Sequence, residues 1–309
     1  MKRFWGLLLA CFPLFAAEEP RYSFNGAVLY WWTQAPGLAY AVKGSVNPDT
    51  TATKGKILNP PEKPEVGFEL GFRGILPKRG WDLYLQATHL HSRASFDKYS
   101  SGSTLLFPLL ISSNSQGFVD SVKGHWRLHF VMFDLELGKK IETSSCLDIR
   151  PHIGLKYARI RQKYRLRYSG GSLFPGGRDR VYMTNKYLSP GLRMGLDADW
   201  RIKWGLSIFS EMAFSILYGN ALIHQEEHIT SKPKSRIMRK FPLGAPVIDL
   251  NLGVKWDRDR YGVYLAWEEH LFFSMNNTFT LVQPNFQTLQ SSRESLSLGG
   301  LTFGGRYSF

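Results

Sequence analysis

The side chains with the greatest chemical potential in this sequence are acids and bases that alternate with apolar residues. Residues 146–164, for example, place Asp148, Arg150, His152 and Lys156 at even positions, while apolar residues fill many of the odd ones. Because successive side chains of a β-strand point to opposite faces, this period of two separates an ionisable face from an apolar face. Over the whole chain, the ionisable residues assigned to the inner face, as candidate pore-lining residues, are Glu69, Arg73, Asp82, Asp134, Glu136, Asp148, Arg150, His152, Lys156, Arg193, Asp197, Glu211, Asp249, Lys255, Glu268, His270 and Arg306.

Ionisable groups that strands enclose can have two consequences. Rings of charge select the ions that pass through a pore, whereas opposite charges in balance can pair and close a narrow lumen. The inner set holds nine acids, six Lys or Arg residues and two histidines, so its charge is roughly balanced. Both interpretations stay open, because a barrel of intermediate size lies between filled and open lumens.

A second group of candidate residues is basic and lies outside the inner set. Basic residues recur at every second position from 159 to 167, and others cluster between 232 and 240. Such clusters bind phosphate groups through charge-assisted hydrogen bonds, or they form a solvated rim. The candidates for binding polyanions are Arg159, Arg161, Lys163, Arg165, Arg167, Lys232, Lys234, Arg236, Arg239 and Lys240.

Motifs for metal binding and catalysis are weak in this sequence. Residues 224–228 read His-Gln-Glu-Glu-His and match the H-x-x-E-H metalloprotease pattern, but that chemistry needs a helix, and this segment lies in an expected loop. His89 and His91 share a strand face, where a polar role fits them better than chelation. No phosphate-binding glycine loop, serine-nucleophile elbow or paired cysteine motif occurs. The sequence therefore predicts no enzyme, no cofactor and no metal site.

The elements that must position these residues are strands, and the last segment, 296–309, is the clearest of them. Leu301, Phe303, Tyr307 and Phe309 share one face of it, and the chain ends on an aromatic residue. A segment of this pattern can cross a bilayer as a tilted strand, and in a closed barrel the last strand pairs with the first. Phe303, Tyr307 and Phe309 also resemble the signal that bacterial outer-membrane barrels present to their assembly machinery.

Other segments of the same period complete an all-β, antiparallel transmembrane barrel of about ten strands, within a range of about 8–12. The predicted strands are 22–33, 66–76, 81–91, 125–138, 146–164, 187–198, 204–218, 247–256, 261–273 and 296–309. Short turns follow every second strand, and the long loops between the others are 45–64, 92–124, 168–180, 219–244 and 275–293. Outer-membrane barrels show this rhythm of short periplasmic turns and long outer loops, which a soluble β-sandwich does not explain.

One strand departs from the simple pattern. In residues 125–138 the apolar side chains change parity half-way along. This change predicts either a β-bulge or an aromatic residue in the lumen.

The amino terminus has the basic, apolar and small-residue order of a secretory signal peptide. Residues 1–17 are the predicted signal, and residues 18–309 form one barrel domain. Residues 8–11 also fit a lipoprotein processing box, which would leave a lipidated Cys11. Cys146 is the other cysteine, so no intramolecular disulfide follows after cleavage. The formal charge of +14 favours anionic lipopolysaccharide over nucleic acid as a partner of an exported barrel.

Several segments resemble the pore-forming, major-outer-membrane-protein-like family of Legionella and the chlamydiae. They are 80–85, 125–130, 134–138, 150–155, 215–219 and 267–268, in the same order as in that family. The resemblance implies an outer-membrane porin that lets small hydrophilic solutes diffuse passively. The alternative is a non-conducting, structural or adhesive barrel whose basic outer loops bind polyanions. The expected partners are outer-membrane lipids and lipopolysaccharide, the barrel assembly machinery and small solutes, with the oligomeric state left open.

Overall fold

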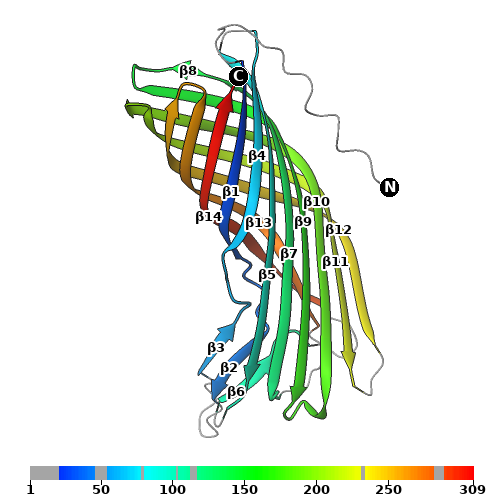
Figure 1. Ribbon diagram of the computed structural model, residues 1–309. Helices are drawn as coiled ribbons and strands as arrows, with labels where there is room; N and C mark the ends of the chain where they lie inside the picture. The colour runs from blue at the N-terminus through cyan, green and yellow to red at the C-terminus, as the bar shows by residue number, and fades with distance from the viewer. Residues whose placement is uncertain are drawn as a thin grey trace, which may run out of the picture.

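Ten antiparallel strands form a closed barrel in the computed structural model, which confirms the predicted fold class (Figure 1). The ring order is β10–β11–β12–β13–β14–β1–β4–β5–β7–β9, and β9 pairs with β10 to close it. The strands are β1 (Tyr22–Gln34), β4 (Glu65–Ile75), β5 (Trp81–Tyr99), β7 (Ser121–Lys139), β9 (Leu147–Gly170), β10 (Phe174–Lys203), β11 (Leu206–Ile229), β12 (Ser235–Arg258), β13 (Tyr261–Leu281) and β14 (Leu289–Ser308). A two-residue strand, β8 (Ile141–Glu142), pairs with the start of β9.

The structure describes residues 21–45, 54–77, 80–101, 104–111, 117–230, 234–281 and 289–309. The predicted signal peptide, the processing box with Cys11, and Lys232 lie outside these residues. In the described part of the chain, no helix is long and apolar enough to cross a membrane.

The barrel closes through its last and first strands, as the terminal segment predicts. β14 pairs with β1 along the whole of their shared length. The Tyr22 N–H donates to the Phe309 carbonyl (3.0 Å), and the Phe309 N–H donates to the Tyr22 carbonyl (2.8 Å). Tyr307 lies on the outer face between Phe309 and Tyr261, with ring centroids 6.0 and 5.2 Å apart. The assembly signal ascribed to these aromatic residues stays a prediction.

Six of the strands continue far beyond the closed barrel. β4 stops pairing with β5 at Leu90, and β13 stops pairing with β12 at Val247. Beyond these positions β5, β7, β9, β10, β11 and β12 run on as one curved sheet, hereafter the extension (Figure 1).

The long outer loops that the sequence predicts are therefore largely strand. The predicted loops 168–180 and 219–244 are wrong as loops, because they form the outer parts of the β9–β10 and β11–β12 hairpins. Strand pairing also enters 92–124 and 275–293, where β5 reaches Tyr99 and β13 pairs with β14.

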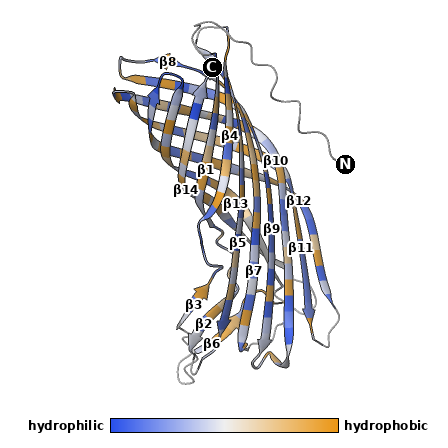
Figure 2. Ribbon diagram, in the orientation of Figure 1, coloured by the Kyte–Doolittle hydropathy of each residue, from blue (hydrophilic) through white to orange (hydrophobic). Residues whose placement is uncertain are grey.

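The wall changes polarity where the barrel passes into the extension. In the barrel Leu155 on β9 is 54% exposed on the outer face, while its neighbour Lys156 is buried inside. In the extension Arg165 is exposed on the outer face, while its neighbours Tyr164 and Leu166 are buried. Figure 2 shows the hydrophobic and hydrophilic residues alternating along these strands.

This inversion accounts for the change of parity in residues 125–138. β7 pairs with β5 and β9 without interruption across that segment, so a bulge there was the wrong prediction. The luminal aromatic alternative is correct, since Phe130 is fully buried inside. The strand keeps its register, and what changes is the medium outside it, from an apolar one to a polar one.

A small sheet covers the concave face of the extension (Figure 1). Its strands are β2 (Ala41–Ser45), β3 (Lys54–Leu58) and β6 (Thr104–Pro108). The Tyr164 and Tyr168 hydroxyls of β9 donate to the carbonyls of Leu38 (3.1 Å) and Tyr40 (2.7 Å). Apolar residues of both sheets form one buried core, which explains why the inner face of the extension is hydrophobic.

Candidate functional site: the lumen and the outer face

Arg150 on β9 is the centre of a buried layer of ion pairs across the lumen. Its guanidinium donates to Asp82 Oδ1 (2.7 Å), Glu136 Oε2 (3.0 Å) and Asp197 Oδ2 (2.7 Å). These acids come from β5, β7 and β10, so one side chain joins three other strands. A Cβ at Gly138 would collide with this guanidinium, which explains why the neighbouring strand carries no side chain there.

The layer continues through two more basic residues. Arg193 Nε donates to Glu136 Oε1 (2.9 Å), and its Nη1 pairs with Asp249. Lys156 Nζ lies 2.9 Å from Asp134 Oδ2 and 3.2 Å from Asp249 Oδ2. Buried ion pairs pay a large desolvation cost, so they are weak evidence for stability. Their consequence here is that these acids and bases neutralise one another.

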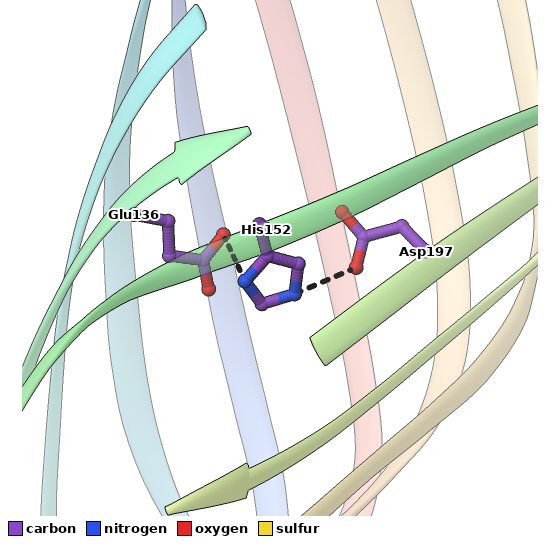
Figure 3. A group of neighbouring side chains, drawn as sticks. All are labelled: Glu136, His152 and Asp197. Atoms are coloured by element: carbon purple, nitrogen blue, oxygen red, sulfur yellow. Dashed lines mark ion pairs between the residues drawn. The ribbon is translucent and has the colours of Figure 1, made fainter. Parts of the chain in front are cut away.

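Three residues of this layer have the spacing of a metal site. The ligand atoms of Glu136, His152 and Asp197 all lie within 4.8 Å of one another (Figure 3). His152 Nδ1 is 3.6 Å from Glu136 Oε2, and its Nε2 is 3.3 Å from Asp197 Oδ1. Arg150 and Arg193, however, already hold the two carboxylates, and their positive charges oppose a bound cation. The geometry therefore fits a histidine held between two acids, and it does not fit a metal centre.

An apolar layer lies above the ion pairs, toward the extension. Phe130 on β7 and Phe272 on β13 make an edge-to-face contact with centroids 5.6 Å apart, and both are fully buried. Five steps around the ten-strand ring separate β7 from β13, so these rings meet across the full width of the lumen. Trp31, Leu128 and Leu298 are also buried at this end. Side chains of the wall itself therefore fill the lumen at this level.

A cavity of about 310 Å³ lies below the ion pairs, toward the short turns. Glu69, Glu211 and Glu268 line it together with Tyr84 and Tyr264. The two tyrosines follow the same parity as the charged residues, so the sequence pattern places them inside, but they carry no charge to mark them. The sequence also predicts turns at Asp199 and Asp257, whereas the structure places them near the ends of β10 and β12, where they pair with Lys255 and Arg306.

In the structure, the ionisable residues assigned to the inner face lie inside the barrel or line this cavity. Most of these residues are buried or engaged in the ion pairs described above. Arg73, Lys255, Glu211 and Arg306 line the cavity. Whether any of them lines a conducting pore stays a prediction.

The outer face of the extension carries the basic residues. On β9, Arg159, Arg161, Lys163, Arg165 and Arg167 all point outward, because each alternate residue is buried. The register brings further residues beside them. His91 was expected in a polar role, whereas Arg93, His125, Arg127, His129 and Lys186 were not among the sequence candidates. These outward residues of β5, β7, β9 and β10 form the convex basic face.

The second predicted basic cluster is separate from this face. Arg236, Arg239 and Lys240 lie on β12, and Lys234 precedes that strand. Arg236 pairs with Glu226 on β11 at 2.8 Å. Register places Lys186 of β10 opposite Leu222 of β11, so an apolar residue interrupts the basic rows before β12.

The H-x-x-E-H match does not form a metalloprotease site. Residues 224–228 lie on β11, not on a helix. His224 and His228 are on the outer face, whereas Glu227 is buried on the other side. Cys146, before β9, is exposed and free.

Comparisons with known proteins agree with a barrel of the outer membrane. A family model described as "Legionella pneumophila major outer membrane protein precursor" matches residues 15–309. Among curated proteins, no sequence matches this chain.

Solved structures resemble the chain only distantly. The outer membrane protease OmpT of Escherichia coli is 12% identical with a TM-score of 0.49, over 93% of this chain and 96% of that one. A major outer membrane protein of Thermus thermophilus is 12% identical with a TM-score of 0.36, over 94% and 100%. The toluene transporter TodX of Pseudomonas putida is 12% identical with a TM-score of 0.33, over 94% and 90%. At these scores the likenesses add nothing to the fold that the strand pairing defines.

Proposed function

This chain belongs to the Legionella pneumophila major outer membrane protein precursor family. We propose that it acts as an outer-membrane barrel with a blocked lumen, and that its convex basic face binds the phosphate groups of lipopolysaccharide. The proposed role is structural and adhesive, without catalysis. It corresponds to the non-conducting alternative that the sequence leaves open.

The observation that carries this proposal is the position of the basic rows. On β9 the outward residues run Ile153, Leu155, Tyr157, and then Arg159 and Arg161. The basic side chains therefore begin where the apolar outer surface ends, which is the level of the lipid headgroups.

The register assembles these residues into a two-dimensional array. His129 and Arg161 are partners across β7 and β9, and Arg127 and Lys163 form the next outward pair. Directly opposed side chains lie about 5 Å apart, so the like charges of Arg127 and Lys163 repel each other. Within the described residues, the one ion pair on this face joins Lys123 to Asp97 (2.8 Å).

An array with so few acids of its own needs an external anion. Arginine forms bidentate hydrogen bonds to phosphate, which makes it the stronger phosphate ligand of the two basic residue types. The phosphates of lipopolysaccharide in the outer leaflet supply this charge at the same depth in the membrane.

The test is lipopolysaccharide binding to the refolded full-length barrel. The variant replaces Arg161, Arg165 and Arg167 by Gln, and the matched control replaces Lys203, Arg258 and Arg260, at the short-turn end, by Gln. At about 1 kcal/mol for each basic residue near a charged membrane surface, the first triple variant should weaken binding by about 100-fold. The control should leave the affinity unchanged. Equal loss in both variants, or binding that added salt leaves unchanged, would contradict the proposal.

A second candidate is the passive diffusion of small hydrophilic solutes. The observation that favours it is the charged cavity of about 310 Å³, which occupies part of the lumen below the ion pairs. Diffusion also requires a route through the ion pairs and through the contact between Phe130 and Phe272. Single-channel conductance of the refolded protein in planar bilayers separates the two candidates. Discrete steps whose size depends on salt would favour the channel.

A further inference from the structure

The cavity below the ion-pair layer has an excess of negative charge that the layer does not neutralise. Glu69 on β4, Glu211 on β11 and Glu268 on β13 converge on it from three parts of the ring. Arg73 is the nearest basic residue along β4, and its guanidinium lies over the Tyr84 ring at 4.9 Å and 3.9 Å from Asp82.

The basic residues at the cavity mouth are also committed to other acids. Lys255 pairs with Asp199, and Arg306 Nη2 lies 2.8 Å from Asp257 Oδ1. Among the described residues that line the cavity, each basic side chain thus lies close to an acid other than Glu69, Glu211 and Glu268.

Thr88 Oγ1 donates to Glu69 Oε2 at 3.4 Å, whereas several other acceptors of the cavity have no donor among the described residues. Glu268 is 4% exposed, and its Oε1 accepts from Asn251 Nδ2 at 3.2 Å. The same Asn251 amide donates to Glu211 Oε2 at 3.1 Å. Glu268 Oε2, Asn251 Oδ1 and Asn25 Oδ1 are buried and accept no hydrogen bond from the residues that the structure describes. A buried acceptor without a donor is costly, and a ligand that brings N–H or O–H groups into the cavity would satisfy these oxygens.

The spacing of the carboxylates argues against a bare metal ion. Among the described residues, the one group of three possible ligands within 4.8 Å is Glu136, His152 and Asp197, and the cavity acids are not part of it. In this arrangement, therefore, the three carboxylates do not form a site for a single small cation. A molecule with one or two ammonium groups on a short carbon chain can span them, and the Tyr84 and Tyr264 rings suit its carbon atoms and its charge.

We propose that this cavity binds a small organic cation with primary ammonium groups, which enters from the periplasmic end of the barrel. The volume of about 310 Å³ is at the lower limit for ligand pockets, which fits a short diamine. Each ammonium donates to two of the three glutamates, and Asn251 Oδ1 and Asn25 Oδ1 accept the remaining N–H groups. This site is independent of the convex basic face, which lies in the extension.

The test uses putrescine and the refolded full-length barrel in detergent, with binding followed by calorimetry. Glu211→Gln and Glu268→Gln each remove one charge. The new side chain keeps the shape of the old one and can still accept the hydrogen bond from Asn251 Nδ2. Each should weaken putrescine binding by about tenfold or more, since hydrogen bonds to a charged group are the strong ones. The matched control is Glu226→Gln, an acid on the outer face of β11 in the extension, which should leave the affinity unchanged.

Two results would overturn the assignment. One is a wild-type barrel, shown to be folded by its heat-modifiable migration, that does not bind putrescine. The other is tighter binding of Mg²⁺ than of putrescine at the same glutamates. If Glu268→Gln does not fold, Glu211→Gln carries the comparison, because that side chain is exposed to the cavity. Lipopolysaccharide binding should be unchanged in all of these variants, so failure here and failure of the proposed function are distinguishable.

Discussion

Asp179, near the outer end of β10, is an acid with no exposed surface. Burial, and then the neighbouring Glu227 carboxyl, raise the pKa of Asp179 to about 8. An unfolded aspartate has a pKa of about 4, so at neutral pH the folded chain holds a proton that the unfolded chain releases. The stability that this proton brings is complete at pH values below about 4 and is lost as the pH rises toward 8.

Replacing Asp179 by Asn should therefore stabilise the extension at neutral and alkaline pH. The amide keeps the size of the side chain and cannot ionise, so the fall in stability between about pH 5 and pH 8 should flatten. We expect the free energy of unfolding at pH 8 to rise by about 1–3 kcal/mol, the cost of an uncompensated buried polar group. Urea unfolding followed by tryptophan fluorescence measures it. Asp259→Asn, on an exposed turn, is the control, and an unchanged pH profile in Asp179→Asn would contradict the prediction.

The histidines of the convex basic face give it a second pH dependence. Partial burial, and then Arg127, lower the pKa of both His91 and His125. Partial burial, and then His91, lower the pKa of His129. At neutral pH these rings are therefore uncharged in the free protein. A bound phosphate favours their charged form, so binding takes up protons and the affinity should rise as the pH falls.

Lipopolysaccharide affinity should increase as the pH falls from neutral into the acidic range, because the histidines then gain a proton. The triple variant His91→Gln, His125→Gln, His129→Gln should lose that increase and keep the affinity of the wild type at the higher pH. His224→Gln, on β11 outside the face, is the matched control. An affinity that falls on acidification, or an unchanged profile in the triple variant, would show that the histidines do not face the ligand.

At the same scale, the sequence predicts which residues face inward but not what they contact. The alternation of side chains along a strand is enough to place Arg150 and Glu136 on the inner face. Their pairing depends on the register between β7 and β9 and on the empty position at Gly138. Register comes from the whole ring, so single segments do not reveal it.

At the scale of elements, the ten strands follow from the sequence because their apolar residues recur with a period of two. The outer halves of the strands were read as loops for a physical reason. In the β11–β12 hairpin most of the outward residues are polar or basic, with Leu222 and Met238 as exceptions, and Pro242, Gly244 and Pro246 interrupt the pattern. A strand with a polar outer face resembles a loop in composition. It is recognised as a strand only when the sheet that covers its inner face is known.

The β11–β12 hairpin should therefore be structural, and its removal tests this. Tyr218 lies opposite Gly244, so a two-residue Asn-Gly turn can replace residues 220–242 without a change of register. The excision removes Ala221 and Ile223 from the buried core and uncovers their neighbours. Each buried apolar side chain contributes about 1–3 kcal/mol, so the urea midpoint and the refolding yield should both fall.

The control for this excision keeps the strands and removes their charge. The double variant Arg236→Gln, Lys240→Gln should fold like the wild type, since both side chains are exposed. An excised barrel with an unchanged midpoint would restore the interpretation of this segment as a dispensable loop.

At the scale of the whole molecule, the inversion of polarity divides the chain into two bodies that share the same strands. The membrane half has an apolar outside and a charged inside, and the extension has a basic outside and an apolar inside. Each half is ordinary for its surroundings, since each buries its apolar side chains away from water. The junction between them is the apolar layer of the lumen.

The apolar layer should make the wild-type barrel silent in planar bilayers, and the double variant Phe130→Ala, Phe272→Ala should show brief, salt-dependent conductance steps. Charged layers take up water and ions, whereas an apolar constriction excludes both until its side chains are cut back. Each substitution costs about 3–5 kcal/mol, so heat-modifiable migration must show that the variant is folded. Phe133→Ala is the matched control, because it lies on β7 three residues away and faces outward, with 44% of its surface exposed. Conductance steps from the wild-type protein would contradict a blocked lumen and would favour passive diffusion as the function.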